Sequence, residues 1–160
     1  MSVHVIYGSD GGTTRALAQR LASRLGGRAI DVAQARVEDF ETPSLLVLGS
    51  PTYGFGDLQT DWEDRLALIK EANLSGKRVA LFGTGDQGMY PDTFVDAMGV
   101  LYDAVVGRGA EVVGFTATDG YTHTASTAVR DGRFVGLALD EDQQPKLTEK
   151  RLSAWVDQIR

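Results

Sequence analysis

The chain has 160 residues, which is enough for one ordinary domain with a good core and too few for two. Its residues are 42% hydrophobic and 24% charged, and no apolar run is long enough to span a bilayer. The formal net charge of −6 argues against a nucleic-acid partner, and the absence of cysteine excludes disulfides, thiolate metal sites and iron–sulfur clusters bound by this chain.

An apolar run from Val3 to Tyr7 predicts a first buried strand that leads directly into a loop rich in glycine and hydroxyl groups. The loop residues are Ser9, Asp10, Gly11, Gly12, Thr13 and Thr14. Glycines let a ligand approach the backbone, hydroxyls can donate, and the start of a helix offers free N–H groups to an anion. We interpret this segment as a phosphate-binding loop. It has no lysine, unlike the loop that grips nucleoside triphosphates. The alternative is an ordinary helix entry with Thr13 as the N-cap.

Strands and helices alternate along the rest of the chain. Further strands are predicted at Leu45 to Gly49, Arg78 to Gly83 and Val112 to Phe115, with a weaker candidate at Arg28 to Val32. Helical spacing of apolar residues appears in residues 17–25, 94–105 and 152–159. Pro91 or Asp92 can start the second of these helices, and Thr148 can cap the last. Such alternation is typical of a parallel sheet covered on both faces.

The segment of about 116–136 interrupts this rhythm and is interpreted as an insertion, after which Gly136 to Leu139 can complete the edge strand begun at Val112. We therefore predict an α/β fold with a doubly wound five-stranded parallel sheet in the order 2-1-3-4-5, the insertion splitting the last strand. A single domain over residues 1–160 is expected. The first residues enter a strand without an export signal, which favours the cytoplasm.

In such a sheet the ligand lies beyond the carboxyl ends of the strands, where three loops should meet. Besides the phosphate-binding loop, these are the loop with Pro51, Thr52, Tyr53, Gly54, Phe55 and Gly56, and the loop with Thr84, Gly85, Asp86 and Tyr90. Tyr53 and Tyr90 can sandwich a planar ring while the backbone of residues 84–86 bonds its polar edge. A phosphate at one end and a flat ring at the other describe flavin mononucleotide (FMN). The alternative for each tyrosine is a lid that only packs.

Several stretches together resemble the flavodoxin family, specifically its long-chain branch, over nearly the whole chain. They are residues 8–14, 49–54, 58–62, 80–87, 96–99 and 134–140. The resemblance implies that Ser9 to Thr14 bind the FMN phosphate, that Tyr53 and Tyr90 flank the isoalloxazine, and that Thr84 to Asp86 reach its pyrimidine edge. It implies non-covalent FMN, no metal and no catalytic residue, in a protein that shuttles single electrons between protein partners and is not an enzyme.

The sequence departs from the family pattern at two residues of this site and at one neighbouring dipeptide. Gly11 replaces the hydroxyl residue that is usual in the phosphate loop. Tyr53 stands where long-chain members commonly carry tryptophan. Gly88 and Met89 occur in the reverse of the usual order before Tyr90.

The expected chemistry depends on one carbonyl and on nearby acids. Reduction places a proton on flavin N5, and we expect the carbonyl of Gly54 to accept a hydrogen bond from that N5–H, because glycine makes the required peptide turn easy. Carboxylates near the site should disfavour the anionic hydroquinone. They are Asp57, Asp61, Glu63, Asp64, Asp86, Asp119 and Asp140 to Asp142. We therefore expect a low-potential, monomeric carrier that alternates between semiquinone and hydroquinone.

The acidic surface favours basic-faced redox partners, such as an NAD(P)H-dependent flavodoxin reductase and an electron-accepting enzyme. The main alternative function is a flavin-dependent NAD(P)H:quinone reductase, although no second nucleotide site or proton-transfer pair is evident. A phosphorylation-dependent receiver needs an acidic metal cluster after the first strand, where this chain has Asp10 alone. His4 and His123 are isolated in the sequence, and we interpret both as structural.

Overall fold

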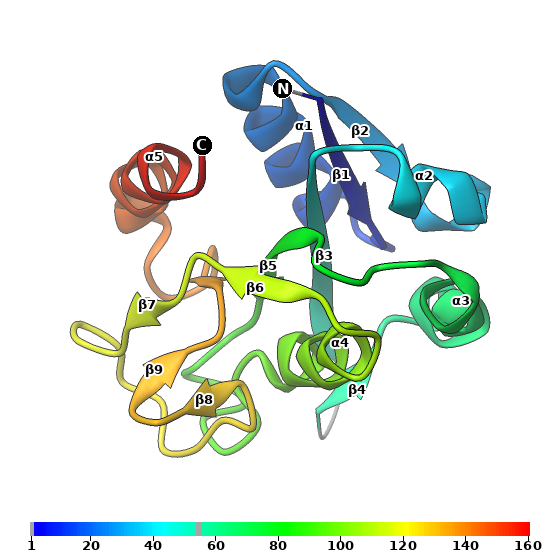
Figure 1. Ribbon diagram of the computed structural model, residues 1–160. Helices are drawn as coiled ribbons and strands as arrows, with labels where there is room; N and C mark the ends of the chain where they lie inside the picture. The colour runs from blue at the N-terminus through cyan, green and yellow to red at the C-terminus, as the bar shows by residue number, and fades with distance from the viewer. Residues whose placement is uncertain (1, 54–55) are drawn as a thin grey trace.

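The computed structural model describes residues 2–53 and 56–160, and its elements alternate along the chain as the sequence predicts (Figure 1). The first half contains β1 (Val3–Tyr7), α1 (Thr13–Leu25), β2 (Arg28–Asp31), a 3-10 turn (Val32–Gln34), α2 (Val37–Glu41), β3 (Leu45–Tyr53), β4 (Asp57–Leu58), α3 (Thr60–Glu71) and β5 (Arg78–Thr84). The second half contains α4 (Asp96–Val106), β6 (Glu111–Val113), β7 (Thr116–Ala117), β8 (Val129–Arg130), β9 (Arg133–Phe134), β10 (Leu137–Leu139), a 3-10 turn (Pro145–Leu147) and α5 (Thr148–Ile159).

The central sheet has the order β2-β1-β3-β5-β10, and these neighbours are parallel. This confirms the predicted doubly wound sheet. Two strands share the fifth position: β6 pairs with the start of β5, where Arg78 lies opposite Glu111, and β10 pairs with its end, where Phe82 lies opposite Leu137. The insertion therefore splits the last strand, as predicted. The short β4, antiparallel to β3, was not predicted.

Helices cover both faces of the sheet. One core cluster joins α1 and α5 to the face that carries Val5, Val47 and Phe82, and the other joins α3 and α4 to the face that carries Leu46 and Leu48. Successive strand residues thus point to opposite cores, as the pleat requires. Figure 1 shows α1 and α5 on one side of the sheet and α3 and α4 on the other. None of the helices in the described residues is long and apolar enough to cross a membrane.

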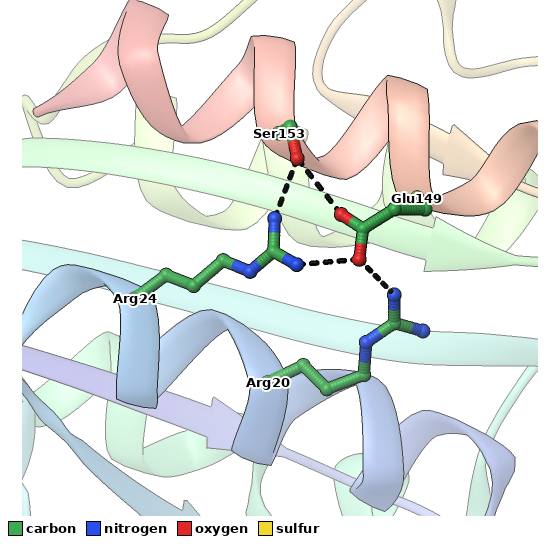
Figure 2. A network of polar contacts seen from close by, with 4 residues as sticks. All are labelled: Arg20, Arg24, Glu149 and Ser153. Carbon is green, nitrogen blue, oxygen red and sulfur yellow. Dashed lines mark hydrogen bonds and ion pairs between the residues drawn. The ribbon is translucent and has the colours of Figure 1, made fainter.

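The helices α1 and α5 are also joined at the surface by charged groups (Figure 2). Glu149 forms ion pairs with Arg24 and, at 3.0 Å, with Arg20, and it accepts a hydrogen bond of 2.8 Å from the Ser153 hydroxyl. Hydrogen bonds from Arg24 and Ser153 are the main cause that lowers the pKa of Glu149 to about 2. All three charged side chains are exposed, so salt will screen this contact.

The insertion forms its own antiparallel sheet in the order β7-β9-β8 and covers the free edge of β10. The Thr116 hydroxyl donates to the carbonyl of Gly136, and the Tyr121 hydroxyl donates to that of Ala138, each at 2.6 Å. Two backbone acceptors, one directly before the edge strand β10 and one within it, are thereby occupied by side chains. Occupying such acceptors protects an edge from pairing with another chain.

The helix starts suggested by sequence differ from the observed ones. Thr13 is the first residue of α1 and Gly12 is the N-cap, with φ of 91°. The helix expected to begin at Pro91 or Asp92 begins at Asp96 instead, where the Thr52 hydroxyl accepts a hydrogen bond from the N–H of Ala97 at 3.0 Å. Thr148 lies inside α5 and makes no capping bond, because a 3-10 turn leads into that helix. Each start is set by contacts or turns that local spacing does not reveal.

His123, which the sequence suggests is structural, lies within the insertion, in an aromatic cluster with Phe94 and Phe134. Its ring centroid is 5.4 Å from that of Phe94, in a stacked arrangement, and 5.2 Å from that of Phe134. Its Nδ1 is buried and has no hydrogen-bond partner among the described residues. Burial therefore lowers the pKa of His123 below its ordinary value.

This burial predicts a loss of stability in acid. The unfolded chain protonates His123 near its ordinary pKa, about 6.5, whereas the folded protein resists protonation until a lower pH. The free energy of unfolding should therefore fall as the pH drops through about 6.5 and level off only below the folded pKa. His123→Phe should reduce that fall, as measured by urea unfolding. An NMR titration of His123 in the folded protein with a midpoint at or above about 6.5 would contradict the prediction.

Candidate functional site

The first loop joins β1 to α1, and a hydrogen bond within the loop stabilises its conformation. The N–H of Gly12 donates to the Ser9 hydroxyl at 3.0 Å, and the N–H groups in the first turn of α1 have no acceptor within the helix. The hydroxyls of Thr14 and Thr84, both buried, lie 3.0 Å apart and join this loop to the end of β5. A Cβ added at Gly11 would meet no atom within 4 Å, so there is open space beside the loop.

The second loop follows β3. Tyr53 is 37% exposed and lies against Asp10 of the first loop. Burial and then the charge of Asp10 raise the pKa of the Tyr53 phenol. Asp10 also accepts a hydrogen bond of 2.9 Å from Gln59. Gly54 and Phe55 lie outside the described residues, and so does the Gly54 carbonyl that is expected to accept a hydrogen bond from the flavin N5–H.

The third loop follows β5 and is folded around Asp86. The Asp86 carboxylate accepts hydrogen bonds from the N–H groups of Gly88 and Met89 at 3.0 and 2.9 Å. The backbone carbonyl of Asp86 accepts a hydrogen bond from the N–H of Tyr90 at 2.8 Å. Burial alone would raise the pKa of Asp86, but hydrogen bonds from Met89, Gln143 and Gly88 lower it below its ordinary value. The loop presents the Tyr90 ring, which is 42% exposed.

The three loops enclose a cavity of about 300 Å³ at the carboxyl ends of the strands. It is lined by Ser9, Gly11, Thr13, Thr14, Pro51, Thr52, Tyr53, Thr84, Gly85, Asp86, Tyr90, Glu141 and Asp142. This volume lies at the lower end of the range for small-molecule sites, about 300–1,000 Å³. The structure thus brings most of the predicted site residues together in one cavity.

Among the residues that the structure describes, three of the predicted site residues do not line this cavity. Gly12 serves as the helix N-cap, Asp10 turns toward Gln59, and a Cβ added at Gly56 would meet the carboxylate of Asp96 at 2.7 Å. The predicted binding set omits two lining residues, Glu141 and Asp142, and uses them only as nearby charges. Their position directly after the last parallel strand is the signal that could have placed them, since carboxyl ends of parallel strands share one edge.

The cavity wall is acidic. Asp86, Glu141 and Asp142 supply three carboxylates to it. Burial, and then the charges of Asp86, Asp140 and Glu141, raise the pKa of Asp142. Of the acids that the sequence placed near the site, those on residues 57–64, Asp119 and Asp140 do not line the cavity. The carboxylates of the cavity wall therefore come from the loops after β5 and β10.

The sheet order, the glycine-rich entry to α1 and the cavity at the carboxyl edge define a doubly wound α/β protein with a ligand site at its switch point. Residues 5–155 match the family model described as Flavodoxin. The chain therefore belongs to the flavodoxin family, as its sequence motifs suggested.

Individual relatives resemble the chain over nearly its full length. It is 44% identical over 162 residues to a flavodoxin of Synechocystis sp., covering 99% of this chain and 95% of the relative. It is 43% identical over 159 residues to flavodoxin 1 of Escherichia coli, covering 97% and 90%. The crystal structure of Fusobacterium nucleatum flavodoxin bound to flavin mononucleotide has a TM-score of 0.93 at 34% identity, covering 99% of this chain and 96% of that one.

Proposed function

We propose that this protein is a one-electron carrier that binds FMN non-covalently in the cavity at the carboxyl edge of its sheet. The observation that carries the proposal is that one cavity combines the start of α1 and its hydroxyl groups with two exposed tyrosine rings. Fusobacterium nucleatum flavodoxin and a single-residue mutant of it, both crystallised with flavin mononucleotide bound, have this fold with a TM-score of 0.93. The chain's relatives are named flavodoxins, which are electron-transfer proteins and not enzymes.

The residues present fit such a cofactor. The open space at Gly11, together with Ser9, Thr13 and Thr14, suits a phosphate held by neutral donors and a helix N-terminus. Tyr53 and Tyr90 would flank the ring, and the polar groups of residues 84–86 would meet its pyrimidine edge. When bound, FMN supplies the redox chemistry, while the chain supplies binding, orientation and electric field.

We propose further that the carrier works at low potential and serves basic-faced partners. The carboxylates of Asp86, Glu141 and Asp142 oppose added negative charge in the cavity, which disfavours the fully reduced anionic cofactor. The same acidic character, with a formal net charge of −6, would speed encounter with a basic reductase and a basic acceptor. Monomeric state, a single domain over residues 1–160 and a cytoplasmic location stay predictions, which gel filtration, limited proteolysis and cell fractionation would test.

The decisive experiment combines a spectrum with potentiometry. The purified protein should show a flavin spectrum, release FMN on denaturation, and take up two electrons in separated one-electron steps. The alternative is a quinone reductase, which would turn over NADPH and a quinone rapidly without added reductase. Colourless protein whose apo form does not bind added FMN would contradict the proposal.

The open space at Gly11 predicts a gain in affinity on substitution. Gly11→Thr should lower the dissociation constant for FMN about fivefold, because a hydroxyl–phosphate hydrogen bond contributes about 1 kcal/mol. Fluorescence titration of the apoprotein measures this change. Riboflavin, which lacks the phosphate, should bind both proteins equally, and Gly11→Ala should bind FMN like the unchanged chain. A similar gain for riboflavin would show that the hydroxyl does not act on the phosphate.

A further inference from the structure

Gln87 is a buried residue at which three separate segments meet. It is only 2% exposed and lies within the third loop. Its side-chain oxygen accepts a hydrogen bond of 2.5 Å from the N–H of Thr122 in the insertion, and its amide nitrogen donates to the side-chain oxygen of Gln144 at 2.9 Å. Its backbone N–H donates to the buried carboxylate of Asp140 at 2.9 Å. Gln87 does not line the cavity.

On the cavity side, the segment from Asp140 to Gln143 contacts both Gln87 and the part of the third loop that leads to Tyr90. Asp140 fixes the backbone of Gln87 and also accepts a hydrogen bond of 2.8 Å from the N–H of Gln143. The Gln143 side chain in turn donates to Asp86 at 2.9 Å, and Asp86 holds the backbone that leads to Tyr90. A displacement of Gln87 would therefore shift Asp86 and Tyr90 as well.

On the other side, the insertion is docked by a second set of contacts. The Gln144 amide nitrogen donates to the carbonyl of Gly120 at 2.8 Å, and Arg151 of α5 donates to the Gln144 side-chain oxygen, also at 2.8 Å. The Arg151 guanidinium lies 3.9 Å from the ring centroid of Tyr121, whose hydroxyl binds the Ala138 carbonyl. These contacts fix the segment that presents the N–H of Thr122 to Gln87.

We propose that Gln87 is a positioning residue through which the insertion sets the shape of the third loop and hence the affinity for FMN. The effect on FMN affinity rests on the proposed function, whereas the effect of the insertion on the shape of the third loop does not. A buried amide that loses its partners costs free energy, so the loop and the docked insertion favour each other. The insertion thus acts on the cofactor site without touching the cavity.

The test is a double-mutant cycle between Gln87→Ala and Tyr121→Phe. Tyr121→Phe removes a docking bond of the insertion and alters no residue of the third loop. Hydrogen exchange of the apoprotein should speed up at the N–H groups of residues 88–90 by about tenfold in either single variant. The dissociation constant for FMN should rise about tenfold for Gln87→Ala and about fivefold for Tyr121→Phe. In the double variant the second change should add nothing, since the connection is already broken.

A matched control and a second variant keep the test decisive. Gln158→Ala removes a glutamine that donates to the Phe115 carbonyl at 2.9 Å, just before the insertion and unconnected to Gln87, so exchange at residues 88–90 should not change. If Gln87→Ala does not fold, Gln144→Ala removes the Gln87–Gln144 bond and the Gln144–Gly120 bond from the partner side, at a half-buried residue, and should raise both the exchange rates and the dissociation constant. Unchanged exchange at residues 88–90, or additive effects in the double variant, would overturn the proposal. Failure of the unchanged chain to bind FMN would refute the proposed function, while exchange in the apoprotein would still decide the coupling.

Discussion

Tyr90→Ala is expected to raise the dissociation constant for FMN by about thirtyfold. The Tyr90 ring is 42% exposed in the protein alone and forms part of the cavity wall. Covering this ring with a flavin gains stacking of about 0.5–1.5 kcal/mol beyond the burial of apolar area at about 25 cal/mol per Å². A total near 2 kcal/mol corresponds to the stated change in affinity. Fluorescence titration of the apoprotein with FMN measures it.

Two variants distinguish stacking from general disturbance of the loop. Tyr90→Phe keeps the ring and should retain most of the affinity. Met89→Ala removes a neighbouring side chain that is 68% exposed and does not line the cavity, so the dissociation constant should stay within about twofold. If Met89→Ala weakened binding as much as Tyr90→Ala, the tyrosine ring would not be the contact that matters.

Gly49→Ala is expected to lower the free energy of unfolding by about 3 kcal/mol, at the upper end of the cost of overpacking a core. Gly49 lies on β3 opposite Phe82 of β5, and a Cβ added at Gly49 would lie 2.0 Å from Cζ of the Phe82 ring. Phe82 is fully buried, and the Gly49 carbonyl accepts a hydrogen bond of 2.8 Å from the Trp62 indole. Neither the ring nor the backbone can therefore move freely. Urea unfolding measures the loss.

The clash itself can be tested by relieving it. In a Phe82→Leu background the added methyl group has more room, so Gly49→Ala should cost less there than in the unchanged chain. Gly11→Ala is the matched control, because a Cβ at that glycine meets nothing within 4 Å. Equal losses from Gly49→Ala in both backgrounds would show that contact with the Phe82 ring is not the cause.

The sheet and its loops could be predicted because the relevant information is local. Buried parallel strands appear as short apolar runs such as Arg78 to Gly83, and the glycine-rich stretches after them mark the loops at the carboxyl edge. Strand order then places those loops together. The cavity accordingly contains residues from all three predicted loops.

What sequence reasoning missed depends on contacts between distant segments. The start of α4 at Asp96 involves the hydroxyl of Thr52, which is far away in the chain. Glu141 lines the cavity because the chain, after the insertion, returns as β10 to pair with β5, and Glu141 follows that strand. The two-residue strands of the insertion, such as β8, are too short to show a reliable alternation. Local patterns cannot report such long-range placement.

The ion pairs of Glu149 with Arg20 and Arg24 have a consequence for how the molecule is made. They connect α1, the helix that follows the first loop, to α5 (Figure 2). During synthesis on the ribosome, α1 is made before α5 and before the cavity residues Glu141 and Asp142, so it can pack against the first strands while that later part of the chain is still missing. A nascent chain therefore lacks the ion pairs of Glu149 and part of the cavity wall until the segment from Glu141 to α5 has been made.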